Sequence, residues 1–130
     1  EEALENISKR ITAKRFLKLN VSGAFHSPFM REPSIQFTEY LKTIKFNKPS
    51  FPVISNYSPS LCDDPKELKI RLANQMCNGV RWRETMDIMA INHDLHFVEI
   101  GPSNVLSGLA KRHFSNAKIS QVSSEDQIAY

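Results

Sequence analysis

The chain has 130 residues, 41% of them hydrophobic and 24% charged, and its 17 Lys and Arg against 14 Asp and Glu give a net charge of +3. This balance is typical of one folded domain, or of one piece of a larger domain, and it excludes collagen-like and low-complexity chains. The apolar runs, such as residues 89–91, are far shorter than the roughly 20 residues of a membrane-spanning helix. The chain opens at Glu1 without a leader, which predicts that it was processed or cut from a longer polypeptide.

The cysteines and the basic residues indicate which cellular compartment and which kinds of ligand to expect. Cys62 and Cys77 follow no secretory signal, so we expect reduced thiols in a reducing compartment: the cytoplasm, or the matrix of a plastid or mitochondrion. Neither cysteine has a Cys or His pair at ligand spacing, which predicts no metal and no bound cofactor. The densest basic group, between residues 9 and 18, shares its predicted helix with acidic residues. We therefore expect a solvated helix face there, and a nucleic-acid module remains an alternative that rests on the basic pI alone.

The first part of the chain predicts a helix, a strand, a loop and a second helix. Residues 1–14 have the spacing of an amphipathic helix, residues 15–21 alternate as in a strand, and residues 22–28 are rich in turn formers. A second helix is expected to open at Pro33 and to end before residue 47. The first helix carries on one face, which we expect to be buried, Leu4, Ile7 and Ile11.

The middle of the chain predicts a short buried strand over residues 51–55, followed by a well-marked helix. Asp64 can accept hydrogen bonds from free backbone amides, and Pro65 suits the first helical position. Glu67 stands three residues after Asp64, as in a capping box.

The last third predicts two more helices and two more strands. One helix runs from Trp82 to about residue 92, a buried strand covers 95–100, Ser103 caps the next helix, and a final strand covers 117–122. Strand and helix thus alternate, which predicts an α/β fold with a parallel sheet. Ligands bind where such strands end in loops, so we expect these groups at one rim: His26, Asn56 and the Gly101–Pro102 turn.

His26 is the candidate for proton transfer. It follows a predicted strand, between small residues and the stiffening Pro28, and an imidazole can take and return a proton near neutral pH. A structural or merely exposed histidine is the alternative. The sequence offers no Gly-rich phosphate loop and no G-x-S-x-G elbow that would expose a serine nucleophile. The residues therefore describe a base without its nucleophile, which is half of a site.

Four segments resemble one enzyme family in order and spacing. They are VSGAFHSPFM at 21–30, VISN at 53–56, NQMCNGVRW at 74–82 and VEIGPSNVLSGL at 98–109. Together they resemble malonyl-CoA:acyl-carrier-protein transacylases over about residues 15–122. The resemblance concerns only the C-terminal portion of that family, roughly its last two-fifths. The related acyltransferase domains of polyketide and fatty-acid synthases share most of these motifs.

The resemblance implies a fold and a domain division. Residues 22–130 would be the C-terminal part of a hydrolase-like α/β acyltransferase core. Residues 1–21 would be the closing helix and strand of a small ferredoxin-like subdomain. The N-terminal half of the same enzyme would supply the rest, including the serine nucleophile and an arginine that holds the malonyl carboxylate.

The resemblance also implies an activity and its residues. A serine would attack the thioester of malonyl-CoA, and the phosphopantetheine thiol of acyl carrier protein would then take the malonyl group. His26 matches the family's catalytic histidine, and Gln75 matches the residue whose main-chain carbonyl orients that imidazole. Phe25 matches a position where a bulky ring favours malonyl over methylmalonyl units, although Phe25 could equally be a core aromatic. This chain alone is expected to be inactive.

The remaining expectations concern partners. Acyl carrier protein is acidic in this family, so Lys111 and Arg112, at the end of the last predicted helix, are candidate docking residues. A favourable placement at a helix C-terminus is the alternative for both. For the chain as a whole, the alternatives are a polyketide-synthase-type acyltransferase, weakened by Gly23 where those domains often carry histidine, and a non-catalytic carrier-binding module of the same fold.

Overall fold

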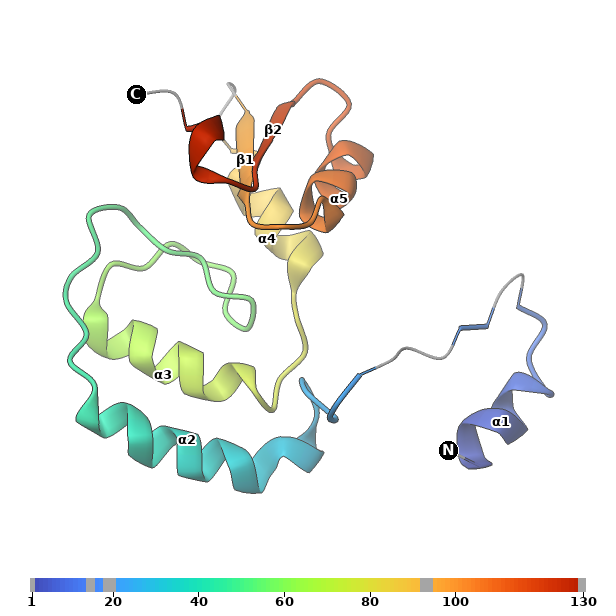
Figure 1. The fold of residues 1–130 in the computed structure, drawn as a ribbon. Coiled ribbons are helices and arrows are strands. Elements are labelled where there is room, and N and C mark those ends of the chain that lie inside the picture. The colour runs from blue at the N-terminus through green and yellow to red at the C-terminus, as the bar shows by residue number, and fades with distance from the viewer. Residues whose placement is uncertain (1, 14–15, 18–20, 92–94, 129–130) are drawn as a thin grey trace.

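The computed structural model describes residues 2–13, 16–17, 21–91 and 95–128 (Figure 1). No helix in these ranges is both long and apolar enough to cross a membrane. In chain order the elements are α1 (Glu2–Ser8), a 3-10 turn (Pro28–Met30), α2 (Arg31–Thr43), α3 (Pro65–Gln75), α4 (Trp82–Met89), β1 (His96–Ile100), α5 (Val105–His113), β2 (Lys118–Val122) and a 3-10 turn (Glu125–Gln127).

Helices α2 and α3 pack against each other, and the loop over residues 50–62 lies along α3 (Figure 1). The predicted start of α3 is confirmed, because Asp64 Oδ1 accepts a hydrogen bond from the Lys66 amide at 2.9 Å and Pro65 is the first helical residue. Glu67 points along the helix instead of back to its start. Its Oε1 accepts from Nε of Arg71 at 2.8 Å, so the expected capping box is not formed.

Arg71 ties the 50–62 loop to α3. Arg71 is almost fully buried, at 8% exposure, and its Nη1 donates to the carbonyls of Ser58 at 3.2 Å and Ser60 at 2.7 Å. Together with Glu67, these acceptors satisfy a charge that would otherwise be costly to bury. The loop is therefore fixed by polar contacts rather than by a sheet.

The predicted parallel sheet is confirmed, but in the described residues it has two strands. β1 and β2 pair in parallel, from His96 opposite Lys118 to Ile100 opposite Val122, with α5 as the connection between them. The described part of the chain has an α/β fold with this one two-stranded sheet. The Phe97 and Phe114 rings stack at 5.1 Å between the strand and the end of α5.

The start of α5 differs from the prediction. Ser103 does not cap the helix; its Oγ donates to Glu99 Oε1 at 3.3 Å. Glu99, from β1, supplies the cap, since its carboxylate accepts from the amides of Leu106 at 3.2 Å and Ser107 at 2.8 Å. A tertiary contact has replaced the local one, because the strand end brings a carboxylate to the positive end of the helix.

Two predicted strands are wrong or lie largely outside the described residues. Over residues 51–55 the structure has a single antiparallel bridge, between Val53 and Cys62, and Phe51 is 73% exposed. A bridge does not extend into a strand where no further partner is hydrogen-bonded. Of the expected strand 15–21, residues 16, 17 and 21 have no regular structure, and the others are not described.

Burial is sparse for a chain of this size. The buried apolar side chains in the described residues belong to Leu41, Cys62, Met86 and Ala110. The accessible surface is 10695 Å², whereas a compact monomer of 14.9 kDa exposes about 7,000 Å². The expectation of a buried stripe on the first helix is wrong within this chain, because Leu4 and Ile7 are about half exposed. β1 is likewise half open, with Ile100 83% exposed.

Candidate functional site

The loop that carries His26 is held by its own hydrogen bonds. Ser27 Oγ donates to the carbonyl of Ala24 at 2.6 Å and accepts from the Phe29 amide at 3.3 Å, and Pro28 opens the 3-10 turn that leads into α2. His26 has a φ of 63°, in the left-handed region that side chains other than glycine adopt seldom. Such a conformation persists only where the surroundings hold it.

The end of α3 provides that support. The His26 amide donates to the Met76 carbonyl at 2.9 Å. Its ring Nδ1 lies 3.0 Å from the carbonyl oxygen of Gln75 and 3.2 Å from that of Asn78. Carbonyls in the last turn of a helix have no helical amide to accept from, so they are free for these contacts. The structure thus brings together His26 and Gln75, which lie 49 positions apart in the sequence.

These contacts determine which ring nitrogen can act as a base. A carbonyl oxygen only accepts, so both contacts require a proton on Nδ1 of His26. In the neutral ring Nε2 then carries the free lone pair. The histidine is exposed, which leaves Nε2 open to a group supplied from elsewhere. The arrangement is suited to general-base chemistry with a carbonyl in place of the usual carboxylate partner.

Phe25 precedes the histidine and is 54% exposed. Its ring lies close over Gly23: a Cβ built at Gly23 would stand 3.2 Å from Phe25 Cε2. Glycine at position 23 therefore leaves room for this ring orientation. The exposure of Phe25 shows that its ring is not a core aromatic within this chain.

The other expected rim residues are only partly brought together. Asn56 and Gln75 line the same largely apolar cavity of about 370 Å³, and the Asn56 carbonyl accepts from the Arg81 amide at 2.8 Å. The Gly101–Pro102 turn stays with the sheet, where Gly101 donates to the Val122 carbonyl at 2.9 Å and its own carbonyl accepts from Gln121 at 3.1 Å. No hydrogen bond among the described residues joins this turn to His26.

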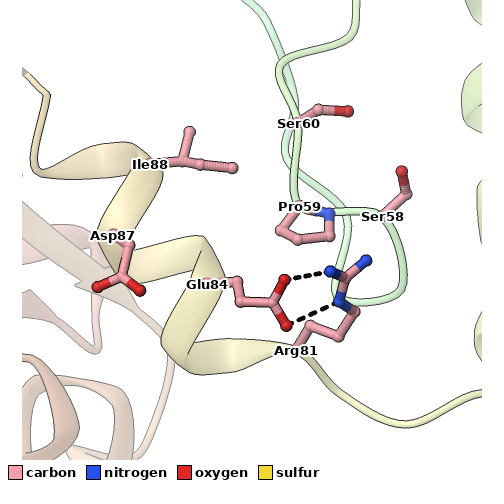
Figure 2. A pocket seen from close by; sticks show the side chains of 7 residues that line it. All are labelled: Ser58, Pro59, Ser60, Arg81, Glu84, Asp87 and Ile88. Carbon is pink, nitrogen blue, oxygen red and sulfur yellow. Dashed lines mark hydrogen bonds and ion pairs between the residues drawn. The ribbon is translucent and has the colours of Figure 1, made fainter.

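A second cavity, of about 350 Å³, lies where the 50–62 loop meets α4, and most of the residues that line it are polar or charged (Figure 2). Arg81 and Glu84 form an ion pair on its wall, beside Pro59. The hydrogen bond from Arg81 holds the pKa of the Glu84 carboxyl below its usual value. Because the charge of Arg81 is already matched, this cavity is a poor candidate for binding a substrate carboxylate.

Lys111 and Arg112 lie in the last turn of α5 and are exposed. Arg112 Nε donates to the Gly108 carbonyl at 3.1 Å, within the same helix. Neither residue approaches His26 through a described hydrogen bond. Their position agrees equally with the docking role and with a simple helix-end role.

Sequence reasoning missed the part played by Asn78. Its carbonyl is the second acceptor at Nδ1 of His26, and its side chain folds back on the helix end. The available signal was its position directly after the predicted helix, at Asn78–Gly79, where a helix commonly ends and its carbonyls become free.

Comparison with known proteins places these residues in context. No family model matches the chain. A curated malonyl CoA-acyl carrier protein transacylase from Synechocystis is 38% identical over 125 residues, which are 96% of this chain and 43% of the relative. The crystal structure of a Synechocystis malonyl-CoA:ACP transacylase matches 96% of this chain and 43% of its own with a TM-score of 0.87 and 38% identity. A malonyl transacylase solved with a type II polyketide synthase acyl carrier protein has 31% identity and a TM-score of 0.81 over 95% of this chain and 40% of its own.

These findings agree on one similarity. Homologues over most of the chain are malonyl CoA-acyl carrier protein transacylases, and the chain matches only their C-terminal part. The chain spans about two-fifths of the length of these relatives.

Proposed function

We propose that this chain forms the C-terminal part of an acyltransferase that moves a malonyl group from malonyl-CoA to the phosphopantetheine thiol of acyl carrier protein in fatty-acid biosynthesis. The observation that carries the proposal is the imidazole of His26, whose Nδ1 is held by the Gln75 carbonyl so that Nε2 is the free base. The homologues named malonyl CoA-acyl carrier protein transacylase support the same substrate and acceptor.

The proposed reaction has two balanced halves. In the first, Nε2 of His26 takes the proton of a serine hydroxyl, the serine oxygen bonds to the malonyl carbonyl carbon, and the carbon–sulfur bond breaks. The coenzyme A thiolate leaves with the proton from the imidazolium. In the second, Nε2 takes the proton of the carrier thiol, and the carrier sulfur bonds to the malonyl carbonyl carbon. The ester bond between that carbon and the serine oxygen breaks, and the serine oxygen takes the proton back from the imidazolium. The role of Gln75 is to orient the ring, and no metal or cofactor enters either half.

The serine and the carboxylate-binding arginine are proposed to come from polypeptide outside this chain. Two observations support a larger body: the relatives are more than twice as long as the matched part, and the chain exposes about half as much surface again as a compact monomer. We propose that residues 22–130 complete a hydrolase-like core and that residues 1–21 complete a small ferredoxin-like subdomain. The exposed apolar residues of α1 and β1 would then be covered. Limited proteolysis of the longer polypeptide should leave α1 intact, and rapid cleavage there would contradict this division.

Two further roles concern selectivity and docking. We propose that Phe25 crowds an α-methyl group and so favours malonyl over methylmalonyl, a steric effect of about 1–3 kcal/mol. Lys111 and Arg112 are proposed to meet acidic acyl carrier protein, since both are exposed cations. Charge reversal of both should raise KM for the carrier and leave KM for malonyl-CoA unchanged. An unchanged carrier KM at low salt would reject the docking role.

The decisive test is the intact mass of the native polypeptide that contains these residues, before and after incubation with malonyl-CoA. A polypeptide longer than 130 residues that gains one malonyl group supports the acyl-serine step. Addition of acyl carrier protein should then remove that group. A polypeptide that never gains it, although it binds the carrier, would favour the non-catalytic module of the same fold.

A second candidate function is the same transfer to a polyketide synthase carrier. The specific support is the structural neighbour that was solved with a type II polyketide acyl carrier protein. Parallel assays with a fatty-acid carrier and a polyketide carrier separate the two functions, and faster transfer to the polyketide carrier would contradict the fatty-acid assignment.

We also propose that the protein works in a reducing compartment, which is the cytoplasm or the matrix of a plastid or mitochondrion. The free thiols of Cys62 and Cys77 support this location. Recovery of the native protein with either thiol oxidised would contradict it.

A further inference from the structure

We propose that Asn78 is a positioning residue for His26, acting through both its main-chain carbonyl and its side-chain amide. The proposal deepens the proposed function and rests on it, because the ring that Asn78 would orient is the base of the transfer. The contacts that carry it all lie at the junction between the His26 loop and the end of α3.

The side chain of Asn78 closes the turn that follows α3. Its Nδ2 donates to the Asn74 carbonyl at 2.7 Å. The Cys77 amide donates to the same oxygen at 3.2 Å. The Met76 amide also donates to it, so this carbonyl, one residue before the end of α3, is bound by three residues that follow the helix. The chain over residues 75–78 is therefore folded back rather than extended.

This turn presents its carbonyls to His26 from three positions. Gln75 and Asn78 face the ring Nδ1, at 3.0 and 3.2 Å, and Met76 accepts from the His26 amide at 2.9 Å. The single proton on Nδ1 is thus shared between two acceptors. With the Gln75 carbonyl alone, the ring could swing about its bond to that oxygen. The second acceptor defines the plane of the ring, and hence the direction of Nε2.

The backbone of His26 makes this support more important. A φ of 63° is a conformation that histidine leaves readily unless other contacts hold it. Loss of the Asn78 side-chain bond would let the 75–78 turn relax and withdraw one acceptor from the ring. The expected result is a mispositioned base with an otherwise intact fold, because Asn78 belongs to no helix or strand. Within the part of the chain that the structure describes, its side-chain amide donates to the Asn74 carbonyl alone.

The experiment compares Asn78→Ala with Asn47→Ala in the full-length polypeptide. Asn47 is the matched control, since it lies exposed in the loop after α2. Steady-state kinetics give kcat and KM for malonyl-CoA, and ¹⁵N imidazole shifts report which nitrogen of His26 carries the proton. Asn78→Asp serves as a second variant that keeps the shape of the side chain but has no amide donor.

For Asn78→Ala we expect kcat to fall about tenfold with KM for malonyl-CoA unchanged, because a displacement near 1 Å can cost about 10²-fold. The population protonated at Nε2 should rise, and Asn47→Ala should match the wild type in both measurements. Wild-type kcat with a wild-type tautomer would overturn the proposal. So would a fall in kcat that follows thermal stability while the tautomer stays unchanged. If the tautomer shifts but even the wild type transfers no malonyl, the proposed function fails and the positioning role stands.

Discussion

The loop that carries His26 and the helix α1 are held in different ways. Around His26, backbone and ring donors meet carbonyls at the end of α3, at 2.9 to 3.2 Å. α1 has no buried residue, and its Leu4 and Ile7 face solvent. A directional polar site can be completed by two nearby elements, whereas an apolar face is satisfied only when a second surface covers it. The candidate base is therefore formed within this chain, and its surroundings are not.

The largest effect should follow from removal of the base itself. In the full-length polypeptide, His26→Asn should lower kcat/KM for malonyl transfer by about 10²–10⁴-fold, the usual contribution of a positioned general base. Asparagine is chosen because it tolerates the left-handed conformation that His26 adopts, so the loop should persist. The measurement is the transfer rate to acyl carrier protein. Activity within tenfold of the wild type would remove His26 from the mechanism.

Two alanine substitutions, one of a buried and one of an exposed apolar side chain, test how much each contributes to stability. Met86 is 2% exposed, and Met86→Ala should destabilise the 130-residue chain by about 2–5 kcal/mol. Leu4 is 57% exposed, and Leu4→Ala should change stability by less than about 0.5 kcal/mol. Urea unfolding measures both. Equal losses would show that α1 packs against the rest of the chain.

A smaller effect concerns the carboxylate that caps α5. Hydrogen bonds from Ser107, and then from Leu106 and Ser103, hold the pKa of Glu99 below its usual value near 4.5. A carboxyl with a lowered folded-state pKa adds stability above about pH 4.5, and this contribution is lost as pH falls through the folded-state pKa. Thermal unfolding between pH 6 and pH 3 should show this loss in the wild type and a flatter profile in Glu99→Gln. Parallel profiles would contradict the cap.

The smallest effect is expected at the ring beside the histidine. Gly23→Ala places a methyl 3.2 Å from Phe25 Cε2, so the exposed ring should turn away while the fold is retained. If Phe25 crowds an α-methyl group, the preference for malonyl over methylmalonyl should change by a few-fold, within the range for one methyl group. Competition between the two thioesters measures this preference, with Phe25→Ala as the reference for a missing ring. An unchanged preference in both variants would reject the steric role.

The elements that the sequence predicted well are those whose signals are local. Asp64 and Pro65 mark the start of α3 because cap and ring geometry act within a few residues. The final strand was also predicted correctly, since β2 lies within one residue of the predicted range 117–122. The contact between His26 and Gln75 came from family resemblance, because nothing local links residues 49 positions apart.

The predictions that went wrong depend on partners distant in sequence. The segment 51–55 has strand composition but forms only the Val53–Cys62 bridge, because strand pairing needs a neighbour that composition does not reveal. Ser103 was predicted to cap α5, but Glu99 caps it instead. The position of the Glu99 carboxylate depends on how β1 packs against the helix, which the local sequence does not show. Asn78 was missed for the same reason, since its role appears only when the His26 loop lies against it.

The buried guanidinium of Arg71 has a consequence for local motion. The Arg71 guanidinium joins α3 to the carbonyls of Ser58 and Ser60. If the 50–62 loop separated from α3, these hydrogen bonds would break and leave a partly buried charge without its acceptors, which costs free energy. Loop and helix should then open as one cooperative unit, with amide hydrogen exchange at Val53 and Cys62 matching that of α3. Asn56 on this loop and Gln75 on this helix line one cavity, so its two walls would open and close together.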